Sequence, residues 1–310
     1  MNKKIISWLL LFTVTSFVAA SVQGQEEGSR LLGVIKVAKV TGSVTAIKDG
    51  NTIDLSAGVE LTQGYVVNTA NDSSVVLVFS NGATVNLAQD TSLSIDEFLQ
   101  DPFADEISVA AMTAEPSSST TKLNLSRGEL VGNVKKLNTD AGSTFTVNTP
   151  VGAAGIRGTT FRIVFRPDGT GRAFFSLTTV EGNVVLASGT VNMPSEVSVP
   201  DNKEVEVLID VTVDDVTGAV TVTAGPSTPV IVIDTPPATQ AAVAATVQQV
   251  TQAVANVVFT TPTTTPTPTP TTPTPTTPTT EKPAETPPPT TNQPPPATAP
   301  TPRTTTGDGK

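Results

Sequence analysis

Short apolar segments recur at regular intervals between residue 32 and about residue 224. They are rich in Val, Ile, Leu and Thr, and Gly, Asn or Asp separates them about every 8 to 12 residues, which is typical of an all-β domain. Apolar and polar positions alternate in several of them: Phe145 and Val147; Phe161, Ile163 and Phe165; Val205, Val207 and Ile209. Alternation places one face of a strand in a core. The pattern predicts a twisted, layered β-sheet in the form of a roll, a sandwich or a solenoid-like stack.

One segment, Val75–Phe79, is apolar without interruption, which is typical of a strand covered on both faces. Two dipeptides predict hairpin turns. Asp49-Gly50 lies between Val44–Lys48 and Thr52–Leu55, and Asn81-Gly82 follows Val75–Phe79. Both dipeptides tolerate the positive φ angles of a type I′ turn.

A weak internal repeat accompanies the strands. Gly42, Gly128 and Gly182 each lie just before a segment that restarts with Val or Leu. Repeated strand-turn units of this kind can stack in layers. The repeat favours a layered β architecture over a helical one.

The period changes after Pro236-Pro237. Five valines then follow one another at intervals of four or three residues, which is the pattern of one apolar stripe on a helix: Val243, Val247, Val250, Val254 and Val257. We expect a helix over 238–258. It either packs on the β domain or forms a short coiled coil, through which the chain would associate with itself.

The end of the sequence is a Thr/Pro tract. It holds 16 of the 26 prolines, and residues 261–310 contain too few apolar residues to form a core, so we expect them to be disordered. The tract is either a semi-rigid stalk in polyproline II geometry or a passive tail.

The first 24 residues have the pattern of a secretory signal peptide. Lys3 and Lys4 precede an apolar run that ends near Ala20 and is too short to span a bilayer. We expect cleavage after Gly24, with cleavage after Ala20 as the alternative. Because no other apolar stretch of spanning length occurs, we expect a periplasmic or secreted bacterial protein with no membrane span once the signal peptide is removed.

The composition removes several kinds of chemistry. The 310 residues include no Cys and no His, which excludes a Cys/His zinc site, a thiol nucleophile, a Ser-His-Asp triad and an imidazole base. The net charge of −10 opposes nucleic acid and anionic lipid surfaces. Asp210, Asp214 and Asp215 lack the spacing of an EF-hand and are interpreted as a solvated turn. We expect no nucleic-acid partner, no cofactor and no metal.

One motif points to a family. The segment from Phe145 to Ile163 contains F-x-V-x-T-P and, further along, a hydrophobic residue, Ile156, that directly precedes R-G-T-x-F. It resembles the signature of the FecR domain, and upstream segments resemble other elements of that domain in the same order: Gly42–Val44, Leu61–Thr69, Val76–Leu87, Ser92–Ile95 and Leu123–Leu130. The resemblance covers about residues 33–185. Residues 186–225 continue the β pattern, as an extension of the same sheet or as a small second unit.

The residues that carry the family motif are these: Thr149, Pro150, Arg157, Gly158, Thr159 and Phe161. Pro150 should end the strand before it. The three glycines at 152, 155 and 158 predict a tight, irregular turn before a strand restarts near Thr159, with Phe161 in the core. Arg157 is interpreted either as an internal clamp that bonds the carbonyls of this turn or a carboxylate, or as a contact for an anion or a partner. A turn with three glycines favours the clamp.

FecR-domain proteins are known as sensors in cell-surface signalling, in which a cytoplasmic anti-sigma segment accompanies an extracytoplasmic FecR region. This sequence shows no cytoplasmic segment. The resemblance therefore implies a non-catalytic module in the bacterial envelope that binds or senses a protein or an envelope glycan. The alternatives are a structural surface protein that displays a β domain on the Thr/Pro stalk, and a carboxylate-based enzyme such as a glycosidase. An enzyme is disfavoured because Trp8, the single Trp, leaves with the signal peptide.

Overall fold

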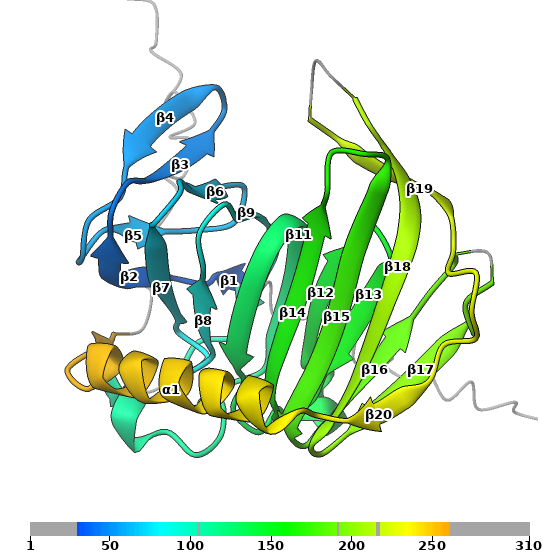
Figure 1. The fold of residues 1–310 in the computed structure, drawn as a ribbon. Coiled ribbons are helices and arrows are strands. Elements are labelled where there is room, and N and C mark those ends of the chain that lie inside the picture. The colour runs from blue at the N-terminus through cyan, green and yellow to red at the C-terminus, as the bar shows by residue number, and fades with distance from the viewer. Residues whose placement is uncertain (1–29, 104–105, 191, 215–217, 261–310) are drawn as a thin grey trace, which may run out of the picture. The chain divides into compact units, whose positions relative to one another are not determined.

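The structure is a computed structural model that describes residues 30–260, apart from 104–105, 191 and 215–217. The expected signal peptide (1–24) and Thr/Pro tail (261–310) lie outside the described residues. The described chain forms two large β-sheets that enclose one main apolar core, and a separate two-stranded sheet (Figure 1). The prediction of an all-β domain with a short helix near its C-terminal end is confirmed.

Sheet I has the strand order β4–β3–β6–β9–β11–β12–β13–β16–β17, with β1 next to β6 along the same edge of β9. Its strands are β1 (Leu31–Leu32), β3 (Val44–Lys48), β4 (Asn51–Asp54), β6 (Val66–Thr69), β9 (Ser92–Gln100), β11 (Ser119–Asn133), β12 (Thr144–Thr149), β13 (Gly152–Ile156), β16 (Asn183–Ala187) and β17 (Glu196–Pro200). The β11–β12 ladder is parallel, and the other ladders of this sheet are antiparallel.

Sheet II has the order β5–β2–β7–β8–β11–β14–β15–β18, with β19 and β20 both on the outer edge of β18. Its further strands are β2 (Ile35–Thr41), β5 (Glu60–Leu61), β7 (Ser74–Phe79), β8 (Thr84–Leu87), β14 (Thr160–Pro167), β15 (Arg172–Glu181), β18 (Lys203–Val213), β19 (Val220–Ala224) and β20 (Val232–Asp234). The long strand β11 belongs to both sheets: its first part pairs with β9 and β12, and its last part with β8 and β14.

Three glycines mark points at which the chain passes from one sheet to the other. Gly42 lies between β2 and β3, Gly182 lies between β15 and β16, and Gly128 lies inside β11 where its pairing changes. Their φ angles are +70°, +90° and +102°, values that L side chains rarely adopt. The repeat seen in the sequence therefore corresponds to a repeated change of sheet.

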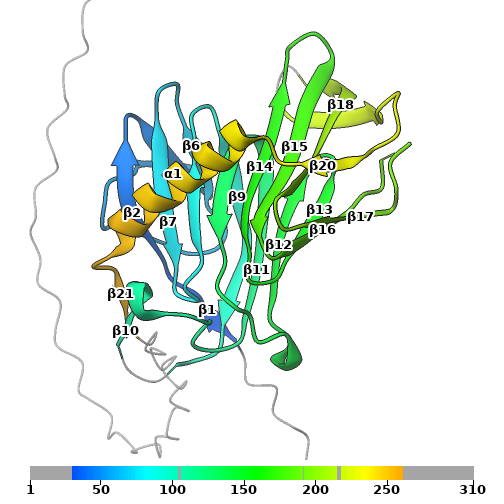
Figure 2. The same ribbon diagram turned by 60° about the horizontal axis from the view of Figure 1, so that its bottom comes forward.

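The strand β7 confirms the expectation drawn from its unbroken apolar run. Its residues Val75, Leu77 and Phe79 face the main core, whereas Val76 and Val78 belong to a second apolar cluster on the opposite face. That second cluster is covered by α1 (Pro237–Val254), which crosses the outer face of sheet II (Figure 2). The strand is thus buried on both sides.

The helix packs on the β domain, as one of the two interpretations predicted. Val250 and Val254 lie in the second cluster, so sheet II already covers this part of the stripe that a coiled coil would use. The predicted end at residue 258 is wrong: the helix ends at Val254, because β21 (Val258–Phe259) pairs with β10 (Ile107–Ser108). Two 3₁₀ turns, η1 (Val109–Ala111) and η2 (Thr139–Ala141), complete the elements.

The two predicted hairpin turns differ. Asp49 and Gly50 both have positive φ angles, 51° and 78°, as a type I′ turn requires. At the second turn only Gly82 does, so the prediction of a type I′ turn at Asn81-Gly82 is wrong. The Asn81 side chain is buried and accepts a hydrogen bond from the backbone N–H of Ala83. A side chain bonded to its own turn favours another turn geometry.

The described residues between 186 and 225 extend the same two sheets. β17 pairs with β16 in sheet I, and β18 pairs with β15 in sheet II. Among the described residues, no helix is both long and apolar enough to cross a bilayer.

Candidate functional site

The family motif forms a hairpin in sheet I, followed by a crossing into sheet II. β12 ends at Thr149, and Pro150 and Val151 form the turn, as the proline predicted. The expectation of one irregular turn through residue 158 is wrong, because Gly152–Ile156 is the strand β13, paired with β12 and β16. At Gly152 a β-carbon would lie 2.3 Å from the carbonyl oxygen of Ala187. Gly152 thus permits close strand pairing and does not loosen the chain.

Thr149 organises this turn. Its Oγ1 accepts hydrogen bonds from the backbone N–H groups of Val151 and Gly152, each at 3.2 Å, and donates to the carbonyl of Gly152 at 2.9 Å. The hydroxyls of Ser188 and Thr190 donate to the carbonyl of Val151 at 2.8 and 3.0 Å. Three hydroxyl groups therefore hold the turn in place. The sequence signal for this role is the hydroxyl residue directly before Pro150.

Thr159 and Phe161 lie where the motif enters sheet II. Gly158 has a φ angle of +63°, and β14 begins at Thr160, one residue after the predicted start. Phe161 is fully buried in the main core, as expected. Its ring packs directly on Gly132, since a β-carbon at Gly132 would lie only 2.4 Å from the Cζ atom of Phe161. Thr159 is buried, and its methyl group lies against Gly182.

Arg157 does not form the internal clamp that the sequence favoured. Its side chain is exposed, and its guanidinium makes no hydrogen bond or ion pair with the residues that the structure describes. The physical reason is that Thr149, Ser188 and Thr190 already satisfy the polar groups of the neighbouring hairpin turn. An exposed guanidinium with five donors remains available to an anion or to a partner.

Arg157 lines a groove of about 700 Å³ on sheet I, which we call the polar groove. Its lining is formed mainly by small or polar residues of β12, β13, β16 and β17 and of the turn η2 with the residues that follow it: Thr139, Gly142, Ser143, Thr144, Phe145, Thr146, Gly155, Ile156, Arg157, Asn183, Val185 and Glu196. Because Gly155 has no side chain, the floor of the groove is open there. A β-carbon at this position would lie 3.7 Å from the carbonyl oxygen of Val185. The groove thus presents hydroxyl and amide groups, one cation and one anion.

A second group of charges lies on the outer face of sheet II. The carboxylate of Glu129 accepts hydrogen bonds from Arg162 Nε at 2.7 Å and from an Nη atom of Arg166 at 3.0 Å. All three side chains are partly exposed. The sequence shows the strand alternation that places the arginines on one face, but it does not show that β11 brings Glu129 opposite them.

Glu204 on β18 is almost fully buried on the same sheet. Its Oε2 accepts a hydrogen bond from Thr178 Oγ1 at 3.2 Å, whereas its Oε1 has no partner among the described residues. Burial, and to a lesser degree the negative charge of Glu206, raise the pKa of this carboxyl group above its usual value. A raised pKa can mark a catalytic acid. Among the described residues, the other titratable groups that act on the pKa of Glu204 are Glu206 and Arg162.

The hydroxyl, amide and charged groups of the polar groove are groups that form hydrogen bonds with a ligand or partner. In the described chain, no three acidic residues come together in a way that could hold a metal ion. Asp210 lies exposed on β18, and Asp215 falls outside the described residues. Among the described residues that line the polar groove, Glu196 is the single carboxylate.

Comparison with known proteins agrees with the motif. Residues 65–185 match the model of the family described as FecR protein. This segment is a FecR domain. The match begins at Tyr65, whereas the sequence resemblance begins near residue 33. The matched segment therefore does not include β1 to β5. These strands nevertheless pair with strands of the same two sheets.

Two solved structures are similar to part of the chain. Both are described as a "putative anti-sigma factor" from Parabacteroides distasonis ATCC 8503, at 2.50 and 1.65 Å resolution. They share 13% sequence identity with this chain, with TM-scores of 0.34 and 0.33. The alignment covers 52% of this chain and spans 60% of theirs. No curated protein matches the chain.

Proposed function

We propose that this protein is a non-catalytic binding or sensing module of the bacterial envelope, located outside the cytoplasm. The match of residues 65–185 to the FecR family carries the proposal. The polar groove supports it, because Arg157 belongs to the family motif and yet its guanidinium makes no hydrogen bond or ion pair with the described residues. The partner is a protein or an envelope component that places an acidic group against Arg157 and hydrogen-bonding groups against the threonines of β12.

Site-specific photo-crosslinking in the native envelope tests this surface. A photoreactive residue replaces Thr146, which lines the polar groove, and in a matched control it replaces Thr52, which is exposed on the far edge strand β4. We expect capture of a defined partner from position 146 and none from position 52. Equal capture from both positions, or from neither, would contradict the proposal.

Charge variants separate recognition from folding. Arg157→Ala should reduce crosslinking at position 146 at least tenfold, because a charge-assisted hydrogen bond to the partner is lost. Arg127→Ala is the matched control, since Arg127 is also exposed and does not line the groove. Protease protection of the protein in intact cells, compared with permeabilised outer membranes, tests the location outside the cytoplasm.

A further inference from the structure

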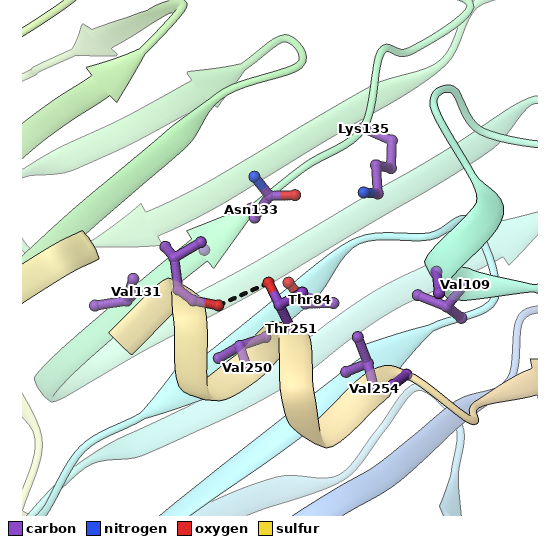
Figure 3. Close-up of a pocket in the computed structure, with 12 residues that line it drawn as sticks. Thr84, Val109, Val131, Asn133, Lys135, Val250, Thr251 and Val254 are labelled. Atoms are coloured by element: carbon purple, nitrogen blue, oxygen red, sulfur yellow. Dashed lines mark hydrogen bonds between the residues drawn. The ribbon is translucent and has the colours of Figure 1, made fainter. Parts of the chain in front are cut away.

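A cavity of about 270 Å³ lies between α1 and sheet II (Figure 3). We call it the helix–sheet cavity. Aliphatic and small residues form most of its wall: Val109, Ala110, Val131, Gly132, Val247, Val250, Val254 and Ala255. The four polar residues of the lining are Thr84, Asn133, Lys135 and Thr251. The lining comes from four separate parts of the chain, so no local sequence signal predicts it.

The charge in this cavity is one-sided. Lys135 is half-buried, and its ammonium group makes no ion pair or hydrogen bond with the described residues. None of the lining residues is acidic. Glu115, whose backbone N–H bonds the carbonyl of Lys136, directs its carboxylate to the backbone N–H of Asn138 and to the hydroxyl of Ser119. A half-buried cation thus has no counter-ion among the described residues, in a chain of net charge −10.

Polar and apolar groups lie on different sides of the cavity. In Figure 3, Lys135 and Asn133 lie across the pocket from Val250, Thr251 and Val254 of the helix. The Thr251 hydroxyl is engaged with its own helix, because it donates to the carbonyl of Val247 at 2.8 Å. The helix side therefore offers mainly aliphatic contact, and the sheet side offers the cation.

We propose that the helix–sheet cavity binds a small amphipathic carboxylate, with its aliphatic chain against the valines of α1 and its carboxylate paired with Lys135. The size agrees: at about 30 Å³ for each water-sized group, the cavity holds roughly nine non-hydrogen atoms. A medium-chain fatty acid anion such as hexanoate fits this volume. Burial of the chain and one charge-assisted hydrogen bond would both contribute to affinity. This site is separate from the polar groove and does not depend on the proposed function.

Titration calorimetry of the full chain with hexanoate tests the proposal. We expect saturable binding at one site, with a Kd at least tenfold weaker in Lys135→Met, which keeps an apolar stem and removes the charge. Lys136→Met is the matched control, because Lys136 is the exposed neighbour, and it should bind as the wild type does. Hexanol should bind at least tenfold more weakly than hexanoate. Absent saturation, or equal loss in both lysine variants, overturns the proposal.

A second pair of variants tests the location without removing charge. Thr251→Phe should fill the cavity and abolish hexanoate binding, whereas Thr246→Phe should not, because Thr246 also bonds its own helix but does not line the cavity. Circular dichroism spectra and Tm measurements serve as the control that both variants fold. Dodecanoate exceeds the cavity volume and should bind more weakly than hexanoate. Affinity that keeps rising with chain length indicates adsorption to an apolar surface and overturns the proposal.

Discussion

Gly128 provides the sharpest test of how the two sheets are joined. It lies inside β11 at the change of sheet, with a φ angle of +102°. A β-carbon at this position would lie 2.2 Å from Thr91 Oγ1 and 2.4 Å from the Cα atom of Thr91. A side-chain atom could rotate away, but a backbone Cα cannot. Gly128→Ala should therefore push the backbone that leads into β9 away from β11.

The size of the effect can be worked out against a matched control. Gly50 also has a positive φ angle, +78°, but nothing lies within 4 Å of a β-carbon there, so Gly50→Ala should cost only the conformational term of about 1–2 kcal/mol. At Gly128, overpacking adds about 1–3 kcal/mol. The displaced Thr91 hydroxyl also accepts a hydrogen bond from the backbone N–H of Glu129 at 3.0 Å, and its loss adds about 1 kcal/mol.

Urea unfolding followed by circular dichroism measures both variants. We expect the free energy of unfolding to fall by about 2–4 kcal/mol more in Gly128→Ala than in Gly50→Ala. In thermal unfolding, the difference in Tm should be about 4–16 °C. Equal losses in the two variants would refute the close approach of β11 to Thr91. Equal losses would mean that both variants lose stability only through the positive φ angle that the two positions share.

Three further predictions concern side chains. Glu204→Gln should raise the free energy of unfolding at pH 7 by about 1 kcal/mol, because it replaces a buried carboxyl group, one oxygen of which bonds no described residue, by a neutral amide. Because the pKa of Glu204 is raised in the folded state, wild-type stability should fall as the pH rises through the window between its unfolded and folded values, and the variant should lack that fall in urea titrations. Arg162→Ala should lower the free energy of unfolding by about 1 kcal/mol, because its ion pair with Glu129 is lost, whereas Arg157→Ala should leave Tm unchanged. A fall in Tm with Arg157→Ala would show that Arg157 is an internal clamp after all. Val254→Asp should lower Tm by several degrees and raise proteolysis between β20 and β21, because it places a charge in the cluster beneath α1; full protection would show that the helix does not need this contact.

The sequence alone predicted most of the elements, because their signals are local. Alternation placed Phe161 and Val205 in the core, and the unbroken run at Val75–Phe79 showed a strand with two buried faces. The period of the valines after Pro237 indicated a helix with one packed stripe. Each of these patterns depends on residues within one strand or one helix, so a single sequence suffices.

Local chemistry misled the interpretation where a distant segment decided the outcome. Gly152 and Gly155 indicated a turn, but β16 pairs with this segment, so the glycines belong to a strand. Arg157 indicated a clamp, but Ser188 and Thr190, more than thirty residues further along the chain, help Thr149 hold the turn. The side chain of Arg157 is therefore exposed.

The sequence by itself determined the β architecture, the position of the helix and the FecR motif, since periodicity and turn residues act over a few positions. Only the tertiary structure decided that β11 joins the two sheets, that Glu204 is buried with one oxygen that bonds no described residue, and that Lys135 lines the helix–sheet cavity. These features depend on which distant segments meet. Contacts between distant segments follow from the packing of the whole core, which no short pattern of residues encodes.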